Sequence, residues 1–262
     1  MKLSVSNIAW SSENDASMYN ALKDIGFTGL EIAPTRIFID APYDNITAAA
    51  EWSRNIYKNY GLSISSMQSI WYGRQESLFG SAEERCALLE YTRKAIDFAA
   101  VIGCGNLVFG CPKNRNMPEG ADEKIAVEFF REIGSYAAQK GTVIGLEANP
   151  TIYNTNFINT TEQAIKMIEK VNSPGFKLNL DIGTMIYNNE GLSILCNKVG
   201  IISHVHISEP HLKPPVHRDL HKEIINLLSE KNYTKYVSIE MGRQENISDV
   251  ISIMNYVREL TY

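Results

Sequence analysis

The chain repeats one pattern eight times: a short apolar run, a polar loop, and a longer stretch with apolar residues at helical spacing. Gly, Pro and Asn residues separate these units. Regular alternation of strands and helices predicts parallel strands, and eight such units close into a (β/α)8 TIM barrel of about 250 residues. With 262 residues and a hydrophobic content of 44%, the chain fits a single TIM-barrel domain over residues 1–262 better than two small domains.

The same pattern places each element along the chain. We expect strands at residues 3–8, 29–32, 62–67, 106–109, 143–147, 176–181, 202–207 and 236–240. We expect helices at residues 14–26, 48–59, 81–102, 122–140, 161–171, 191–199, 217–230 and 246–260, and a long loop at 33–44. The loops after the strands fall on the C-terminal face of the barrel, where sites in this fold are built.

The charge of the chain bears on the class of partner that it can bind. A net charge of −5 and scattered Lys and Arg residues provide no basic field for nucleic acid, so we expect no nucleic-acid partner. The N-terminus alternates like a strand and lacks a signal peptide, and no long apolar run spans a membrane. We therefore expect a soluble, cytoplasmic protein with no membrane partner. The question of a homo-oligomer stays open.

Four of the expected strands carry metal-binding residues near their carboxyl ends. Glu147, Asp181 and Glu240 close three strands, and the seventh strand carries His204 and His206 on one face, with His206 nearer its carboxyl end. If these strands are parallel neighbours, Glu147, Asp181, His206 and Glu240 converge and hold one divalent metal ion. Three carboxylates and one imidazole favour Mn²⁺, with Mg²⁺, Co²⁺ and Zn²⁺ as alternatives.

Such a site suits proton abstraction next to a carbonyl group. A bound ion would stabilise an enediolate, while a carboxylate on either face of the substrate moves the proton. Glu147 and Glu240 lie on strands three steps apart, so they could flank a small polyol from opposite sides. If the proton is removed from one face of the substrate and a proton is delivered to the opposite face, the carbon centre is inverted. If both proton transfers take place on one face, an aldose is converted to a ketose.

The segments that carry these residues also resemble a known family. IGLEANP, LNLDIGTM, ISHVHISEP and YVSIEM resemble the last four strands of the xylose isomerase-like TIM barrel superfamily, in its sugar and sugar-phosphate isomerase/epimerase branch, which includes ketose 3-epimerases. The resemblance implies an enzyme of carbohydrate metabolism that binds a small carbohydrate. It also implies Glu147, Asp181, His206 and Glu240 as the metal ligands, and the two glutamates as the catalytic residues.

Earlier segments extend the resemblance toward the N-terminus. TGLEIAP, SMQSIWYG and LVFGCPKNR are similar to the same branch. They imply substrate-binding roles at the barrel mouth for Glu31, Gln68, Trp71 and Arg115.

The chain departs from ketose 3-epimerases at two positions. These enzymes usually carry a His three residues after the sixth-strand Asp and an Arg six residues after the ligand His, where this chain has Thr184 and Leu212. The metal site is therefore better supported than a ketose substrate. Lys213 or Arg115 could instead meet a phosphate or carboxylate, and Glu209 could orient the substrate or a ligand histidine.

Two histidines are expected outside the metal site. His204 points into the barrel one layer below His206, where a hydrogen-bonded core histidine is the commoner case. His221 is expected on the solvent side of its helix.

The preferred interpretation is a divalent-metal-dependent isomerase or epimerase of a sugar or sugar derivative. The alternative is a metal-dependent dehydratase of a keto-polyol, which uses the same enolate chemistry. An apurinic-site endonuclease on this fold needs more histidines, including ones where this chain has Glu31 and Gln68, and the five histidines here all follow residue 203. A non-catalytic sugar-binding protein is the remaining hypothesis.

Overall fold

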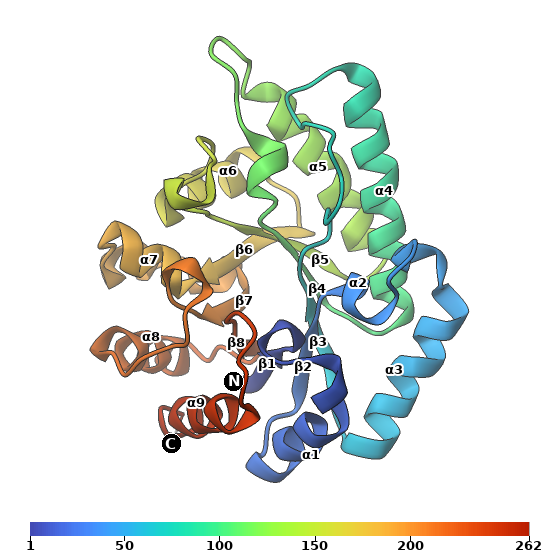
Figure 1. Cartoon of the computed structure of the whole chain (residues 1–262). Helices are drawn as coiled ribbons and strands as arrows, with labels where there is room; N and C mark the ends of the chain where they lie inside the picture. The colour runs from blue at the N-terminus through green and yellow to red at the C-terminus, as the bar shows by residue number, and fades with distance from the viewer. Residues whose placement is uncertain (262) are drawn as a thin grey trace.

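The computed structural model describes residues 1–261 and shows the closed barrel of parallel strands that the alternation predicts (Figure 1). Each strand pairs with its neighbours in chain order, and the last strand pairs with the first to close the ring. The strands are β1 (Lys2–Ser6), β2 (Gly29–Ile32), β3 (Ser63–Met67), β4 (Asn106–Phe109), β5 (Val143–Glu147), β6 (Phe176–Asp181), β7 (Ile202–Ile207) and β8 (Tyr236–Ile239).

Helices surround the strands on the outside of the barrel. The α-helices are α1 (Asp15–Ile25), α2 (Pro34–Ile37), α3 (Ile46–Tyr60), α4 (Ala82–Val101), α5 (Lys124–Gln139), α6 (Thr161–Val171), α7 (Ile182–Asn188), α8 (Asp219–Glu230) and α9 (Ile247–Glu259). Short 3-10 helices are η1 (Asn7–Ala9), η2 (Ser12–Asn14), η3 (Pro42–Asp44), η4 (Pro112–Arg115), η5 (Thr151–Tyr153), η6 (Leu192–Leu195), η7 (Val199–Ile201) and η8 (Pro210–Leu212).

The period of two along the strands separates an apolar outer layer from a polar barrel interior. On β2, the Glu31 side chain contacts His206 of β7 across the barrel, so Leu30 and Ile32 face the helices instead. The side-chain amide of Gln68, which directly follows β3, crosses the interior to the hydroxyl of Ser6 on β1. Polar groups in this interior depend on one another for hydrogen bonds, because little water reaches them.

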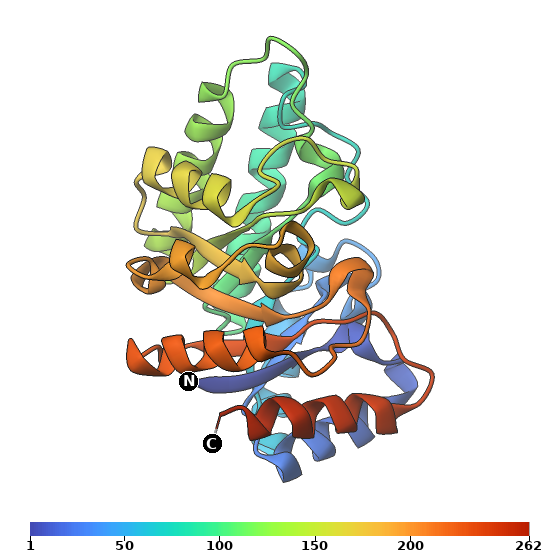
Figure 2. The same cartoon turned by 90° about the vertical axis from the view of Figure 1, so that its left-hand side faces the viewer.

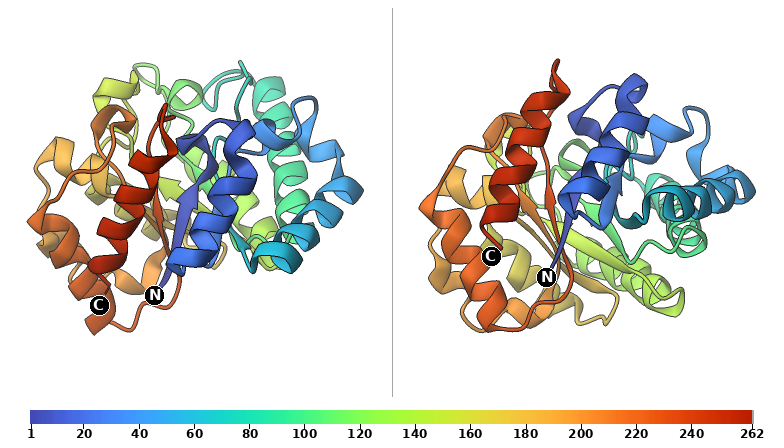
Figure 3. Two further views of the ribbon diagram at one scale, coloured as in Figure 1. Left: turned by 60° about the horizontal axis from the view of Figure 1, so that its bottom comes forward. Right: turned by 90° about the horizontal axis from the view of Figure 1, so that it is seen from below.

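The first and last of the long helices pack against each other and so close the outer ring of helices. Helix α1 packs against α9, which joins the first and last units of the barrel (Figure 3). Helices α8 and α9 run along the outside of the strands (Figure 2). Helix α1 ends at Gly26 with a φ of 93°, a left-handed conformation that glycine adopts without strain.

One predicted helix is misplaced. The sequence pattern predicts a helix at 191–199, but the helix of this unit is α7, which begins directly after Asp181. The carboxylate of Asp181 caps α7 by accepting a hydrogen bond from the Thr184 amide, and the helix ends at Asn189 in a left-handed conformation. Residues 191–199 contain only 3-10 turns and irregular backbone.

Smaller corrections concern loop segments and one histidine. The first strand ends at Ser6 rather than Ile8, because residues 7–9 form η1 with Ser6 at its N-cap. The expected loop at 33–44 contains α2 and η3. His221 is fully buried rather than solvent-facing, and its Nδ1 lies 2.9 Å from the hydroxyl of Tyr256.

Within residues 1–261, no helix combines the length and apolar character needed to cross a membrane.

Candidate metal centre

The four predicted ligands meet at the carboxyl ends of neighbouring strands. Glu147 is the last residue of β5, Asp181 the last of β6, and Glu240 directly follows β8. Asp181 pairs in register with His206 of β7. One donor atom from each of the four residues lies within 4.8 Å of the others. The structure therefore brings the four side chains to one point, as their strand-end positions predict.

His206 lies at the centre of this group. Its Nδ1 is 3.0 Å from Glu147 Oε1 and 3.2 Å from Glu240 Oε2. The imidazole has no exposed surface, whereas the two glutamate side chains are 10% and 11% exposed. Asp181 is half-buried, so the three carboxylates form the part of the centre that solvent or a ligand can reach.

Two asparagines fix the carboxylate of Glu147. Asn179 Nδ2 donates to Glu147 Oε1 over 2.8 Å, and Asn149 Nδ2 donates to Oε2 over 3.1 Å. Asn179 lies on β6, two residues before Asp181, and faces the same side of the sheet. Each carboxylate oxygen of Glu147 therefore has its own amide donor.

Asp181 is held in the same way by other donors. The backbone amide of Thr184 donates to Asp181 Oδ1, and the hydroxyl of Ser208 donates to Oδ2, each over 2.5 Å. Thr184 also donates its hydroxyl to the carbonyl of Ala148, which ties α7 to the chain after β5. The cap of α7 therefore orients the carboxylate of Asp181.

The pKa values of the predicted ligands indicate that several carboxylates lie close together in this centre. Burial and the neighbouring charge of Glu147 raise the pKa of Asp181 to about 6, and burial raises the pKa of Glu240 to about 7. Burial alone would lower the pKa of His206, but the carboxylates of Glu240 and Glu31 hold it well above its usual value. Three carboxylates and an imidazole in one buried space are a donor set that fits a divalent cation.

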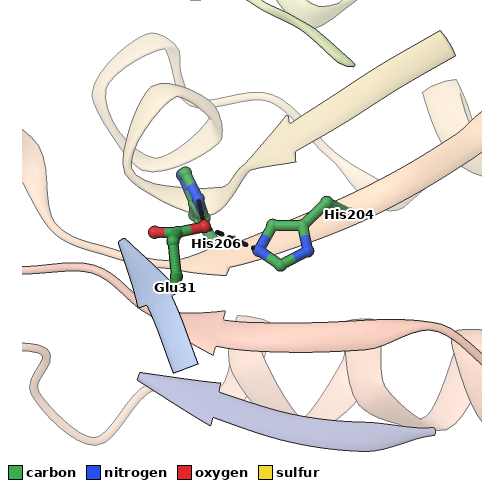
Figure 4. Close-up of side chains that lie close together, drawn as sticks. All are labelled: Glu31, His204 and His206. Atoms are coloured by element: carbon green, nitrogen blue, oxygen red, sulfur yellow. Dashed lines mark hydrogen bonds and ion pairs between the residues drawn. The ribbon is translucent and has the colours of Figure 1, made fainter. Parts of the chain in front are cut away.

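A second group lies deeper and shares His206. Glu31 Oε2 is 3.0 Å from His206 Nε2 and 2.9 Å from His204 Nε2 (Figure 4). All three side chains are at most 1% exposed. His204 thus belongs to the barrel interior, as expected, and reaches Glu31 rather than Glu147, Asp181 or Glu240.

The four residues expected at the barrel mouth are buried. Glu31 and Arg115 have no exposed surface, Trp71 is 2% exposed and Gln68 is 6% exposed. The indole of Trp71 donates to Thr92 and packs edge-on against the ring of Phe109, with centroids 4.6 Å apart. Contacts within the fold therefore cover these side chains, although Trp71 also lines a hollow beside the loops that follow β3 and β4. Their substrate-binding roles stay predictions.

Arg115 makes its hydrogen bonds within the protein. Its guanidinium donates to the carbonyl of Glu147 over 2.8 Å, to Asn149 Oδ1 over 3.0 Å and to the carbonyl of Ile158 over 3.2 Å. Burial lowers the pKa of Arg115 to about 10. This arginine joins the loop after β4 to the end of β5.

Glu209 and Lys213 lie in the loop after β7. The carboxylate of Glu209 accepts two hydrogen bonds from Arg218, over 2.5 and 2.7 Å, which ties this loop to the start of α8. Lys213 is exposed to solvent. Their predicted roles with substrate are untested by these contacts.

A hollow opens on the C-terminal face beside the loops that follow β1, β2 and β3. It measures about 830 Å³, and Ile8, Ala33, Ser69 and Tyr72 are among its lining residues. Ligand cavities usually measure about 300–1,000 Å³, so this hollow has the size of a ligand site, but its lining includes none of the four predicted metal ligands.

Sequence patterns did not identify several residues around the centre. Asn149, Asn179 and Ser208 were missed, although each lies two residues from a strand-end ligand, a spacing that places side chains on one face. Tyr153 was also missed. Its hydroxyl accepts the His211 backbone amide over 2.9 Å, and burial with the charge of Asp181 raises its pKa to about 12.

Comparisons with known proteins agree with this fold. The family model for the xylose isomerase-like TIM barrel matches residues 19–259. The L-ribulose 3-epimerase of Methylomonas sp. (strain DH-1) is 29% identical over 127 residues. That match covers 47% of this chain and 44% of the relative, so less than half of the relative's length is aligned.

Two solved structures superimpose over nearly the whole chain. The 3-keto-D-glucoside 4-epimerase from E. coli is 22% identical, with a TM-score of 0.79 and coverage of 99% of both chains. The D-psicose 3-epimerase from Clostridium cellulolyticum H10, solved with D-tagatose, is 14% identical, with a TM-score of 0.81 and coverage of 100% of this chain and 99% of the other. At these identities, the likeness establishes the shared fold.

Proposed function

Because the chain belongs to the xylose isomerase-like TIM barrel family, we propose that it is a divalent-metal-dependent epimerase or isomerase of a sugar or sugar derivative. The observation that carries this proposal is the convergence of Glu147, Asp181, His206 and Glu240 at the carboxyl ends of β5–β8. The three relatives named above are epimerases of sugars that carry a carbonyl group. Their names favour a substrate with a carbonyl next to the carbon that is inverted.

In this proposal, Glu147, Asp181, His206 and Glu240 hold one ion, and Mn²⁺ suits the oxygen-rich donor set best. When bound, the ion withdraws electron density from a nearby substrate carbonyl and stabilises the negative charge that forms. The amides of Asn149 and Asn179 keep the carboxylate of Glu147 in one orientation.

Glu147 and Glu240 would move the protons. They come from strands that are separated by β6 and β7, and part of each side chain is exposed. One glutamate removes the proton from the carbon next to the carbonyl, and the other delivers a proton to the opposite face. Burial raises the pKa of Glu240 to about 7 without a cation, and a bound cation would favour the ionised form, which can accept the substrate proton.

The test is proton exchange with solvent. The purified protein with Mn²⁺ is incubated in deuterated water with ketoses, aldoses, keto-glycosides and their phosphates, and NMR follows deuterium at the carbon next to the carbonyl. We expect exchange and an epimer or isomer for a true substrate. A dehydrated product would instead indicate the dehydratase. No exchange with any sugar, from a protein that binds Mn²⁺, would contradict the proposal.

A further inference from the structure

The carboxylate of Glu31 lies directly behind the proposed metal ligand His206. Its Oε2 is 3.0 Å from His206 Nε2 (Figure 4). The other ring nitrogen, Nδ1, faces Glu147 and Glu240. Glu31 comes from β2 and His206 from β7, so this contact crosses the barrel interior. The two nitrogens of the His206 imidazole therefore contact two different groups of carboxylates.

Other side chains hold Glu31 in this position. Gln68 Nε2 donates to Glu31 Oε1 over 3.1 Å and also to the hydroxyl of Ser6. His204 Nε2 lies 2.9 Å from Glu31 Oε2, and its ring stands nearly perpendicular to that of His206. Glu31 has no exposed surface. Its carboxylate therefore cannot turn away from His206 without breaking several buried contacts.

We propose that Glu31 is a positioning residue, which holds the Nε2–H of His206 and thereby keeps Nδ1 without a proton, so that Nδ1 can bind the cation. A histidine can bind a metal through either nitrogen, and the hydrogen bond at the other nitrogen selects which one. Without this acceptor, the ring of His206 can rotate or change tautomer. This inference rests on the proposed cation site, but it does not depend on which sugar is the substrate.

The cluster Glu31, His204 and His206 could instead be a second cation site. Three observations disfavour it. The cluster offers only three donor residues, and His206 already directs Nδ1 at the first site. Both oxygens of Glu31 also have protein partners, because Oε1 accepts from Gln68 and Oε2 lies against the two histidines.

The first test is the affinity for Mn²⁺, measured by calorimetry without any carbohydrate. Glu31→Leu removes the acceptor, whereas Glu31→Gln keeps one acceptor oxygen and loses the charge. We expect Glu31→Leu to bind Mn²⁺ about 10–100-fold more weakly than the wild type, and Glu31→Gln to fall between them. The control is Asp15→Asn, which removes a carboxylate that pairs with Arg36 outside the centre and should leave the affinity unchanged.

The second test reads the tautomer of His206 by nitrogen NMR in the Mg²⁺-loaded protein, with its signals assigned by comparison with His206→Gln. We expect Nε2–H alone in the wild type and a mixture in Glu31→Leu. If Glu31→Leu does not fold, Glu31→Gln provides the comparison. We then expect Glu31→Gln to bind Mn²⁺ more weakly than the wild type. Unchanged binding would contradict the proposal.

Four results would overturn the proposal. Equal losses of affinity in Glu31→Gln and Glu31→Leu would assign the effect to charge alone, and unchanged affinity would assign Glu31 no role. Two Mn²⁺ ions per wild-type chain, with one lost in Glu31→Leu, would identify a second cation site. A wild-type chain that binds no Mn²⁺ would remove the basis of the proposal. Mn²⁺ binding without any sugar exchange would refute only the proposed function.

Discussion

At the scale of single residues, Asp181, His206 and Glu240 bind protons more tightly than free side chains do. The pKa of Asp181 rises to about 6 and that of Glu240 to about 7, in each case mainly because the side chain is buried. Both carboxylates must lose their protons before they can bind a cation. A cation and protons therefore compete for the same oxygens.

This competition predicts that Mn²⁺ affinity depends on pH. Above about pH 7 both carboxylates are ionised, and below it first Glu240 and then Asp181 takes up a proton. The affinity should therefore fall by about tenfold for each pH unit and each proton displaced. Calorimetry between about pH 8 and pH 5.5, in buffers of different ionisation enthalpy, measures both affinity and proton release. An affinity that stays constant across this range would contradict the prediction.

Replacing Glu240 tests its role as a proton carrier. Glu240→Gln cannot accept or donate the substrate proton, so we expect solvent exchange to fall by about 10²–10⁴-fold. The deuterium assay at saturating Mn²⁺ measures this loss, because saturation compensates for weaker metal binding. His217→Ala, on an exposed residue that stacks against Tyr256, serves as the control and should retain exchange. If Glu240→Gln exchanges the substrate proton at the wild-type rate, this glutamate does not take part in proton transfer.

At the scale of elements, the loop after β4 supports the end of β5 through Arg115. This fully buried guanidinium satisfies the carbonyls of Glu147 and Ile158 and the side chain of Asn149. Because Asn149 in turn donates to the carboxylate of Glu147, the arginine acts on the centre through that amide. The connection runs from η4 to the last residue of β5.

Removing this connection should destabilise the protein. Arg115→Met leaves buried acceptors without donors, and each such acceptor costs about 1–3 kcal/mol, so we expect a loss of about 3 kcal/mol in the free energy of unfolding. Urea titration measures it. Arg93→Met is the control, because Arg93 forms an exposed ion pair with Glu132 that should contribute at most about 1 kcal/mol. Equal losses in both variants would show that the buried hydrogen bonds of Arg115 contribute little.

The sequence predicted elements best where local signals agree. The strands that carry Glu147, Asp181 and His206 have the predicted bounds, because apolar runs between loop residues mark them. The α7 helix was missed because it follows β6 without a loop, and its N-cap is the strand-end residue Asp181 itself. The contacts of Glu31 with His204 and His206 were not predicted, since a period of two gives the face of a strand but not the partners across the barrel.

At the scale of the whole molecule, the two halves of the barrel contribute different residues to the centre. The carboxyl ends of β5 to β8 supply the proposed ligands, whereas β1 and β2 supply Ser6 and Glu31, and Gln68 directly follows β3. The hydrogen bond between Glu31 and His206 joins these halves across the barrel axis. A bound cation would therefore hold four strands directly and the remaining half through Glu31.

Removal of the cation should then lower the thermal stability of the whole barrel. A ligand that binds only the folded state at about 100 times its Kd stabilises it by about 2.7 kcal/mol. For a domain of this size, each kcal/mol shifts the Tm by about 2–4 °C, so we expect EDTA to lower the Tm by about 5–10 °C. Differential scanning calorimetry with and without Mn²⁺ measures the shift. Asp181→Asn weakens the donor set, so its Tm should respond less to EDTA. Identical wild-type melting curves in Mn²⁺ and EDTA would show that the four strand ends do not share a cation.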